Sequence, residues 1–451
     1  MDANLLSKPA FRDATREMAH VRIDGDSEGA QAIAERFEAR AYPTLLLLDA
    51  GGQEVFRAHH EVTPEEIAPV LASVAGAGKG FSAALQRLDS GGFTRDDCAL
   101  FGAVDWSPAS GMSLSTEARI AALSKAFSRC DGADSTARAR IAAHLLTLAS
   151  AADTYADSAL PGAPVRGLTG PLLDAVFASD DTVWAARGMI TTWSTVVVRW
   201  LQGESRGAEF GALRDRWLRG ASALRKRDGA GLDVVLLSYD AVIDLHKLEH
   251  GSLPLPASIR DEIEAAVTRV DGLAKTPSER HAVVSNEAYL LRSIGFGERA
   301  KELLIREIAR TDAASHYQTT LSQWAKEEGR RDEARRFAHD AVTSARGRIS
   351  RLQWMVNELQ LLSEDVASPE GRALFLTRAA EAYPVLFAGD DAFLGRNAPR
   401  AARLAEMLAP LHEDAAVKAL VETYGPRCGA MTGAQRAACD KHFTTLRTGT
   451  L

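Results

Sequence analysis

Two stretches of the chain, Gly295-Phe-Gly-Glu-Arg-Ala300 and Gly329-Arg-Arg-Asp-Glu-Ala334, give the clearest signal of fold class. Their glycines are 34 positions apart, and each stretch lies between segments whose apolar residues follow helical spacing. In each stretch the glycine permits a turn, and the small alanine five positions later lets two paired helices approach closely. The sequence therefore predicts consecutive helical hairpins in this part of the chain.

The 34-residue spacing resembles the period of tetratricopeptide (TPR) repeats, in which hairpins of two helices stack into a curved solenoid. The match is partial, because the aromatic and proline positions of that family are mostly unfilled. Further helical pairs are predicted within residues 352–383 and 401–424. We expect residues 281–451 to form TPR-like helical repeats, and an irregular bundle is an equal alternative for the helices before Gly295.

The composition favours helices and narrows the classes of function. The chain has 451 residues, of which 46% are hydrophobic, 25% are charged and only 6% are aromatic. These proportions are ordinary for a globular protein, and the abundance of alanine and leucine favours helix over sheet. The net charge of −7 disfavours a nucleic-acid partner, because phosphate binding relies on an excess of basic residues. No run of 18 apolar residues is present, so no transmembrane helix is expected.

The first 76 residues carry a different, mixed pattern. The apolar run Leu45–Leu48 predicts a strand buried on both faces, and the turn residues Asp49–Gly52 after it predict a hairpin with a return strand. Thr63 followed by Glu66 has the spacing of a capping box at the start of a helix. The expected elements are strands near 20–24, 44–49 and 53–57, and helices at 30–37 and from Thr63.

Together these features resemble the C-terminal two-thirds of a thioredoxin-like domain, and most closely the C-terminal periplasmic domain of bacterial thiol:disulfide interchange proteins. The matching features are Leu5-Leu-Ser-Lys-Pro-Ala-Phe11, the strand ending at Asp24, the step Tyr42-Pro43-Thr44, the hairpin at Asp49–Gly52 and the helix from Thr63. The resemblance implies that Pro43 is a cis-proline, and that Tyr42, Pro43 and Thr44 hold an extended partner polypeptide.

The resemblance also implies a Cys-x-x-Cys motif just before Ser7, whereas the first cysteine here is Cys98. No catalytic residue is therefore expected in this chain, and the first strands of the family's sheet are missing as well. Two explanations stay open. Either the gene model begins at an internal methionine, or the protein is a naturally degenerate member of the family that lacks the motif and the first strands. No signal peptide is visible at Met1.

The expected architecture is mostly α: a truncated thioredoxin-like α/β segment at 1–76, a helical region at 77–280 and TPR-like repeats at 281–451. By resemblance, the function is protein thiol–disulfide exchange, with the helical region docking protein or peptide clients, although this chain lacks the redox cysteines. The alternative is a non-catalytic peptide-binding scaffold. The family implies the periplasm, with the cytoplasm as the alternative location. The client, the redox direction and the oligomeric state stay open.

Cys428 and Cys439, eleven positions apart, form a candidate disulfide. Glycines between them permit a chain reversal, and Thr432 can cap a helix running through Cys439, which brings the two cysteines within bridging distance. Two free thiols are one alternative. The other is a zinc site that uses Cys439 with His442 and lacks two further ligands.

Three other motifs have structural interpretations that we prefer. His246-Lys-Leu-Glu-His250 has the spacing of an inverted zinc-protease motif, but Gly251 ends the predicted helix at once and no third ligand is evident. Gly203-Glu-Ser-Arg-Gly207 has the spacing of a nucleophile elbow, but it follows a predicted helix rather than a strand. Gly76-Ala-Gly-Lys-Gly80 is a linker rather than a phosphate loop. No metal and no cofactor are therefore predicted.

Overall fold

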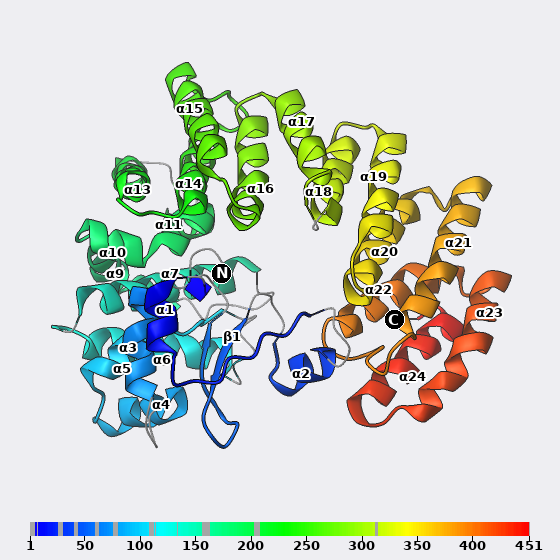
Figure 1. Cartoon of the computed structure of the whole chain (residues 1–451), viewed down its shortest axis with the longest axis horizontal. Coiled ribbons are helices and arrows are strands. Elements are labelled where there is room, and N and C mark those ends of the chain that lie inside the picture. The colour runs from blue at the N-terminus through cyan, green and yellow to red at the C-terminus, as the bar shows by residue number, and fades with distance from the viewer. Residues whose placement is uncertain are drawn as a thin grey trace. The chain divides into compact units, whose positions relative to one another are not determined.

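The computed structural model consists mostly of helices, as Figure 1 shows, and this confirms the predicted fold class at that level. It describes residues 5–6, 8–25, 30–39, 44–58, 63–74, 80–107, 112, 114–132, 134–155, 163–202, 208–311 and 314–450. Within these residues, none of the helices combines the length and the apolar character needed to cross a membrane.

The chain divides into two compact units. The first unit contains residues 1–20 and 41–300, and the second contains residues 21–40 and 301–451. This grouping differs from the three ranges expected from sequence. Most of the thioredoxin-like segment shares a unit with the helical region, whereas residues 21–40 group with the C-terminal helices.

The first unit combines one two-stranded sheet with many helices. Its elements are α1 (Pro9–Ala14), β1 (Leu45–Leu48), β2 (Glu54–Ala58), α3 (Pro64–Val74), α4 (Phe81–Ser90), α5 (Arg95–Ala103), α6 (Thr116–Arg129), α7 (Ser135–Tyr155), α8 (Ala163–Arg166), α9 (Thr169–Val176), α10 (Asp180–Ala185), α11 (Arg187–Thr192), α12 (Ser194–Gln202), α13 (Ala208–Lys226), α14 (Leu232–His250), α15 (Ala257–Leu273) and α16 (Pro277–Ser293).

Among the described residues of the second unit, the regular secondary structure is all helical. Its elements are α2 (Ala30–Arg36), α18 (Ala314–Glu327), α19 (Arg331–Ser344), α20 (Arg348–Leu362), η3 (Ser363–Asp365), α21 (Pro369–Leu386), α22 (Asn397–Leu408), η4 (Ala409–Leu411), α23 (Ala415–Tyr424), η5 (Gly425–Ala430) and α24 (Gly433–Thr448). Helix α17 (Gly297–Ile308) spans the boundary between the two units. The helices predicted within 352–383 and 401–424 are confirmed.

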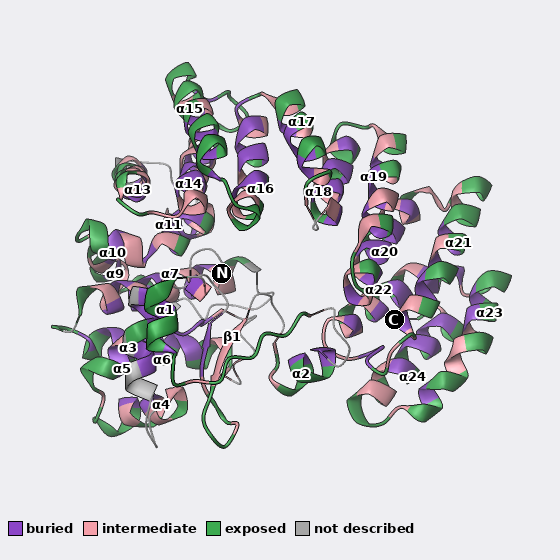
Figure 2. Cartoon of the chain, in the orientation of Figure 1, coloured by how far each residue is buried: buried purple, intermediate pink, exposed green. Residues whose placement is uncertain are grey.

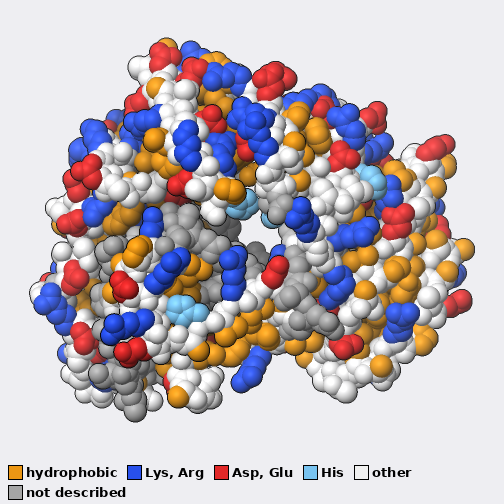
Figure 3. Space-filling model, in the orientation of Figure 1, with side chains coloured by type: hydrophobic (Ala, Val, Ile, Leu, Met, Phe, Trp, Pro, Cys, Tyr) orange, Lys and Arg blue, Asp and Glu red, His pale blue; other side chains and the backbone are white. Residues whose placement is uncertain are grey.

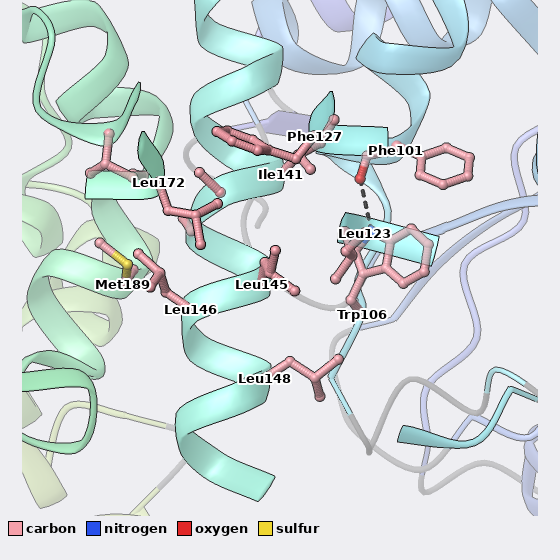
Figure 4. Close-up of a cluster of buried hydrophobic side chains, with 14 of the residues drawn as sticks. Phe101, Trp106, Leu123, Phe127, Ile141, Leu145, Leu146, Leu148, Leu172 and Met189 are labelled. Carbon is pink, nitrogen blue, oxygen red and sulfur yellow. Dashed lines mark hydrogen bonds between the residues drawn. The ribbon is translucent and has the colours of Figure 1, made fainter. Parts of the chain in front are cut away.

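A cluster of buried apolar side chains forms the core of the first unit. Helix α7 packs against α5, α6, α9, α10 and α12, so it must be apolar on several faces. Figure 4 shows Leu146 pointing toward Met189 on one side of α7, while Leu145 lies on the other side. Trp106 joins the same cluster, and its indole Nε1 donates a hydrogen bond to the carbonyl of Phe101 at 2.8 Å.

A separate apolar cluster, formed by residues between Ala341 and Leu446, is the core of the second unit. Figure 2 shows buried residues on the helix sides that face neighbouring helices and exposed residues on the outer sides. Consecutive helices pack on one another here: α18 on α19, α19 on α20, and α20 on α21. The second unit is therefore built largely from contacts between neighbours in the sequence.

The predicted hairpin between two short strands is confirmed. Strands β1 and β2 pair antiparallel, with Leu45 opposite Ala58. In the turn, Oδ1 of the Asp49 carboxylate accepts hydrogen bonds from the amides of Gly51 and Gln53, both at 2.9 Å. Gly52 has a φ of 75°, in the left-handed region that glycine adopts without a steric penalty.

Two expectations for the sheet are wrong. Residues 20–24 form no strand, and Val21 and Ile23 are 82% and 43% exposed, so within the described residues the sheet has two strands rather than three. Leu45–Leu48 is half-buried rather than covered on both faces, and Leu48 is 39% exposed. The reason is that full burial of a strand requires neighbours and covering helices on both sides, which a single antiparallel pair does not supply.

Helix α3 begins with the predicted capping box: the Thr63 amide donates to Glu66 Oε2 at 2.8 Å, and the Glu66 amide donates to Thr63 Oγ1 at 3.3 Å. The buried Glu66 carboxylate also accepts two hydrogen bonds from Arg187 of α11, at 2.6 and 2.9 Å, and lies 3.2 Å from Arg140 of α7. Burial raises the pKa of Glu66, but Arg187 and Arg140 bring it down to about 2. Helix α3 is thus fastened to helices far away in the sequence.

Candidate functional site

The loop predicted to hold a client polypeptide is only partly described. Tyr42 and Pro43 lie outside the described residues, so the cis bond before Pro43 stays a prediction. Thr44 is half-buried and directly precedes β1. The hairpin that follows has the predicted turn, and the four cysteines are bonded to one another in other elements of the chain.

Both pairs of cysteines form disulfides. Cys98 on α5 bonds to Cys130, the residue after α6, with the Cα atoms 5.9 Å apart. Cys428 in η5 bonds to Cys439 on α24, with the Cα atoms 5.6 Å apart. The side chains are buried, with exposed fractions of 2% or less. No cysteine of the chain is left as a thiol.

The pairing of Cys428 with Cys439 is the one proposed from sequence. Their close spacing and the glycines between them indicated a chain reversal that would bring them together. The pairing of Cys98 with Cys130, 32 residues apart, escaped sequence reasoning. Only the even number of cysteines hinted at it. Thiol–disulfide exchange needs a sulfur that the partner can reach, and the cysteines of these two disulfides are buried.

The zinc alternative at Cys439 and His442 is wrong, because both side chains have other partners. Cys439 is bonded to Cys428, and His442 Nδ1 donates to the carbonyl of Ala401 at 2.9 Å. This leaves Nε2 to accept the hydroxyl proton of Tyr383 at 2.9 Å. Burial lowers the pKa of His442 to about 4, although the bond to Ala401 opposes the shift. The imidazole is therefore a neutral structural group in the core of the second unit.

The histidine motif on α14 does not have the arrangement of a metal site. His246 and His250 lie with ring centroids 4.6 Å apart, and α14 ends at His250, as predicted; Gly251, the next residue, has a φ of 66°. The carboxylate of Glu249 pairs with Arg214 instead of facing a metal. Among the described residues, no group of three or more histidines, cysteines and acids has a geometry that would hold a metal ion. The serine motif at 203–207 and most of the glycine linker lie outside them.

The two glycine turns that defined the predicted repeat have the same geometry. Gly295 and Gly329 have φ values of 93° and 74°. After Gly295 the next amide, that of Phe296, donates to the carbonyl of Leu291 at 2.8 Å; after Gly329 the corresponding bond runs from Arg330 to the carbonyl at 325, also at 2.8 Å. Both are Schellman-type helix ends, and the donor and acceptor residues of the second bond each lie 34 positions after those of the first. The equivalence holds at the level of single hydrogen bonds.

The alanines of the repeat lie where close packing needs them. Ala300 and Ala334 are fully buried. In the second hairpin, the carbonyl of Ala334 on α19 accepts a hydrogen bond from the Ser322 hydroxyl on α18 at 2.8 Å. Small residues thus bring α18 and α19 into contact along their length.

The helices α18 and α20 present polar side chains to solvent. Gln323 on α18 and Asn357 on α20 are exposed, and so is His316, whose ring meets Trp354 of α20 edge-on with centroids 5.1 Å apart. Figure 3 shows basic and acidic side chains interspersed over the visible helical surface, without a continuous field of one sign. A surface of this kind suits contacts with a polypeptide better than contacts with a polyanion.

One polar cluster that sequence reasoning missed lies on α14. Asp240 and Asp244 are half-buried and one helical turn apart, near Thr195 of α12 and Tyr289 of α16. Burial, followed by the charge of Asp244, raises the pKa of Asp240 to about 7, and Lys247 opposes the shift. Burial also raises the pKa of Asp244, opposed by a hydrogen bond from Thr195. Acids one turn apart are common on helices, so only burial, which the fold determines, distinguishes this pair.

The comparisons with known proteins give no relative. No protein-family model, no curated protein and no solved structure matches the chain. The thioredoxin-like and TPR-like assignments therefore stay proposals.

Proposed function

We propose that the protein is a non-catalytic scaffold that binds protein or peptide clients through a TPR-like array of helical hairpins. The observation that carries the proposal is the equivalence of the turns at Gly295 and Gly329, which repeats hydrogen bonds and buried alanines at a 34-residue interval. Repeats of this kind expose an extended face made of the first helix of each hairpin. In the second unit these helices are α18 and α20, with Gln323 and Asn357 on the exposed side.

The cysteines support the scaffold over the exchange enzyme. Exchange by a thioredoxin-type mechanism needs a thiolate at a helix N-terminus, whereas the four cysteines here are buried in two bonds. Within the described part of residues 1–76, the hairpin at Asp49–Gly52 and the capped helix α3 support a truncated thioredoxin-like segment, and residues 20–24, which form no strand, weigh against it. The loop at 42–44 would then contribute client binding rather than chemistry.

The same disulfides favour an oxidising compartment. Structural disulfides persist in the periplasm or outside the cell and are rare in the cytosol of most organisms. This agrees with the periplasmic family that residues 1–76 resemble. We therefore place the protein in the periplasm, and a cytoplasmic location is the alternative.

Site-specific photocrosslinking in cells tests the binding face. A photoreactive amino acid is placed at Gln323 or Asn357, and matched controls carry it at Asp332 or Thr343 on α19, which are also exposed. We expect the same client adduct from both positions on α18 and α20 and none from the two controls. Adducts that form equally at all four positions would contradict a defined face.

A redox assay tests the exclusion of enzyme activity. The purified chain should not accelerate the reduction of insulin disulfides by a dithiol. Dithiol-dependent turnover that disappears in Cys98→Ser or Cys130→Ser variants would overturn the scaffold proposal and place an active site at the buried pair.

A further inference from the structure

Helix α2 is bound to the second unit by a few specific polar contacts. The Gln31 side chain is completely buried, and its Oε1 accepts a hydrogen bond from the Arg396 amide at 3.0 Å. Its Nε2 donates to the carbonyl of Gly25, six residues earlier in the same segment, at 2.8 Å. One helical turn later, Glu35 Oε2 accepts a hydrogen bond from the Gly395 amide at 2.9 Å. Two consecutive backbone amides before α22 thus bind one glutamine and one glutamate side chain.

The receiving turn is shaped for this contact. Gly395 has a φ of 49°, and a Cβ atom at this position would lie 2.8 Å from Gln31 Oε1. The turn itself is held by hydrogen bonds among residues 391–397, including one from the Asn397 side chain to the Asp391 carbonyl at 3.1 Å. We define residues 391–397 as the seat. Glycine at 395 leaves the space that the glutamine occupies.

Helix α2 has little stability of its own. It has seven residues, far fewer than an isolated helix needs in water. It is followed by Glu38 with a φ of 49°, a left-handed conformation that side chains other than glycine rarely adopt. Its buried side chains are small or polar, namely Ala30, Gln31 and Ala34, while Ile33 is 41% exposed. The seat therefore supplies most of what keeps α2 folded, and little apolar area resists its release.

We propose that α2 is an exchangeable internal ligand, and that the seat recognises a short helix carrying glutamine and glutamate four residues apart. The chain before residue 21 and the chain after residue 40 belong to the first unit, so α2 returns to its seat as a tethered segment after each release. A helix of the same chemistry supplied in trans competes for the two amides of the seat. Occupancy by α2 then controls whether this part of the second unit is open to a partner, which adds regulation to a binding function without depending on the α18–α20 face.

Peptide binding to the full chain tests the proposal. A fluorescent peptide of residues 26–40 is titrated into wild-type protein and into a Gln31→Ala/Glu35→Ala variant, whose resident α2 has lost both side-chain contacts. We expect saturable binding to the variant at least about tenfold tighter than to wild type, because the resident α2 competes only in the latter. The same peptide carrying the two alanine substitutions should not bind.

A pair of glycine variants provides the matched control. Gly395→Ala, added to the double variant, should weaken peptide binding at least about tenfold, since its Cβ meets the incoming glutamine. Gly433→Ala imposes a similar left-handed strain, with a φ of 55°, but nothing lies within 4 Å of its Cβ, so binding should be unchanged. Equal effects of the two substitutions, or no binding to the double variant, would overturn the proposal.

Hydrogen exchange decides the matter if the double variant fails to fold. In otherwise wild-type protein, amides of residues 34–37 should be protected, and Gly395→Ala should abolish that protection while Gly433→Ala leaves it intact. Amides of α2 that exchange as fast in wild type as in Gly395→Ala would show that the seat does not hold the helix.

Discussion

The hairpin α18–α19 and the N-terminal residues 5–74 are stabilised in different ways. In the hairpin, the two helices are joined by contacts between residues that are close in sequence: the Ser322 hydroxyl donates a hydrogen bond to the carbonyl of Ala334, across a single turn. In the N-terminal residues, the closing contacts are remote. Glu66 is held by Arg187, 121 residues away, and Gln31 by the amide of Arg396, 365 residues away. The first region closes on itself, and the second depends on the rest of the chain.

This difference explains which parts of the molecule can be recognised from sequence. For a local hairpin, the turn residues, the small residues and the spacing of the apolar residues all lie within one short stretch of sequence. For a segment that packs against distant helices, its own sequence contains only one of the two residues that make each contact. The contrast predicts that changes at remote contacts destabilise the protein more than changes at local ones.

The largest effect is expected from the two disulfides. In the chain-entropy model, the bond that closes 32 residues contributes about 4 kcal/mol and the bond that closes 11 residues contributes about 3 kcal/mol. Cys98→Ala/Cys130→Ala should therefore lower the free energy of unfolding of its unit more than Cys428→Ala/Cys439→Ala lowers that of the other. Urea unfolding followed by probes in each unit measures both. A larger loss from the short loop would contradict the contrast.

Arg187→Ala should have the next largest effect, about 3 kcal/mol of unfolding free energy, because it leaves the buried Glu66 carboxylate with Arg140 as its remaining ion-pair partner. The matched control is Arg331→Ala, whose partner Asp365 lies 2.9 Å away in an exposed ion pair, and which should cost less than about 1 kcal/mol. Adding Glu66→Gln to the Arg187 variant should recover part of the loss. Similar losses from the two arginine variants would break the comparison.

The sequence predicted most of the helices and the turns because those signals are local. Asp49 and Gly52 specify their turn, Thr63 and Glu66 specify their cap, and the two repeat glycines specify helix ends. The strand at 20–24 failed for the opposite reason. Its alternating apolar residues satisfy a strand pattern, but a strand exists only beside a neighbour, and the neighbour is not encoded in the segment.

The candidate sites divide in the same way. Cys428 and Cys439 could be paired from an eleven-residue window, whereas Cys98 and Cys130 needed the packing of α5 and α6 to be known. The Asp240 pair was invisible for a related reason. A carboxylate acquires a raised pKa only when other helices cover it, and that cover comes from elements distant in sequence.

The core of the second unit should lose stability in acid. The pKa of His442 is about 4 in the folded chain and near 6.5 when unfolded, so between these values only the unfolded chain binds the proton. The free energy of unfolding should therefore fall by about 3 kcal/mol as the pH drops from 6.5 to 4. His442→Gln should flatten this pH dependence, as measured by urea unfolding at several pH values. An unchanged slope in that variant would show that another group dominates.

The first unit should show the opposite slope from Asp240. Its pKa is about 7 in the folded chain and 3.8 in the reference state, so between these values the folded chain holds a proton that the unfolded chain releases. Stability from this group is present below 3.8 and is lost as the pH rises to 7. Asp240→Asn should raise the free energy of unfolding by about 1–2 kcal/mol at pH 8 and leave it nearly unchanged at pH 3.5. Equal changes in the free energy of unfolding at both pH values would show that Asp240 does not have a raised pKa in the folded chain.

The smallest effect tests whether the two glycine turns are equivalent. A Cβ atom at Gly295 or Gly329 meets nothing within 4 Å, so Gly→Ala adds no clash at either site. Both positions have positive φ, and each substitution should therefore lower the free energy of unfolding by about 1 kcal/mol through backbone strain alone. Because the strain and the surrounding hydrogen bonds match, the two losses should agree within about 0.5 kcal/mol. Gly297→Ala is the control, because Gly297 is the first residue of α17, its φ is not positive and a Cβ atom there meets nothing within 4 Å. This substitution should be neutral or stabilising. Two clearly unequal losses at Gly295 and Gly329 would mean that the 34-residue spacing repeats the shape of the turn without repeating its energetic role.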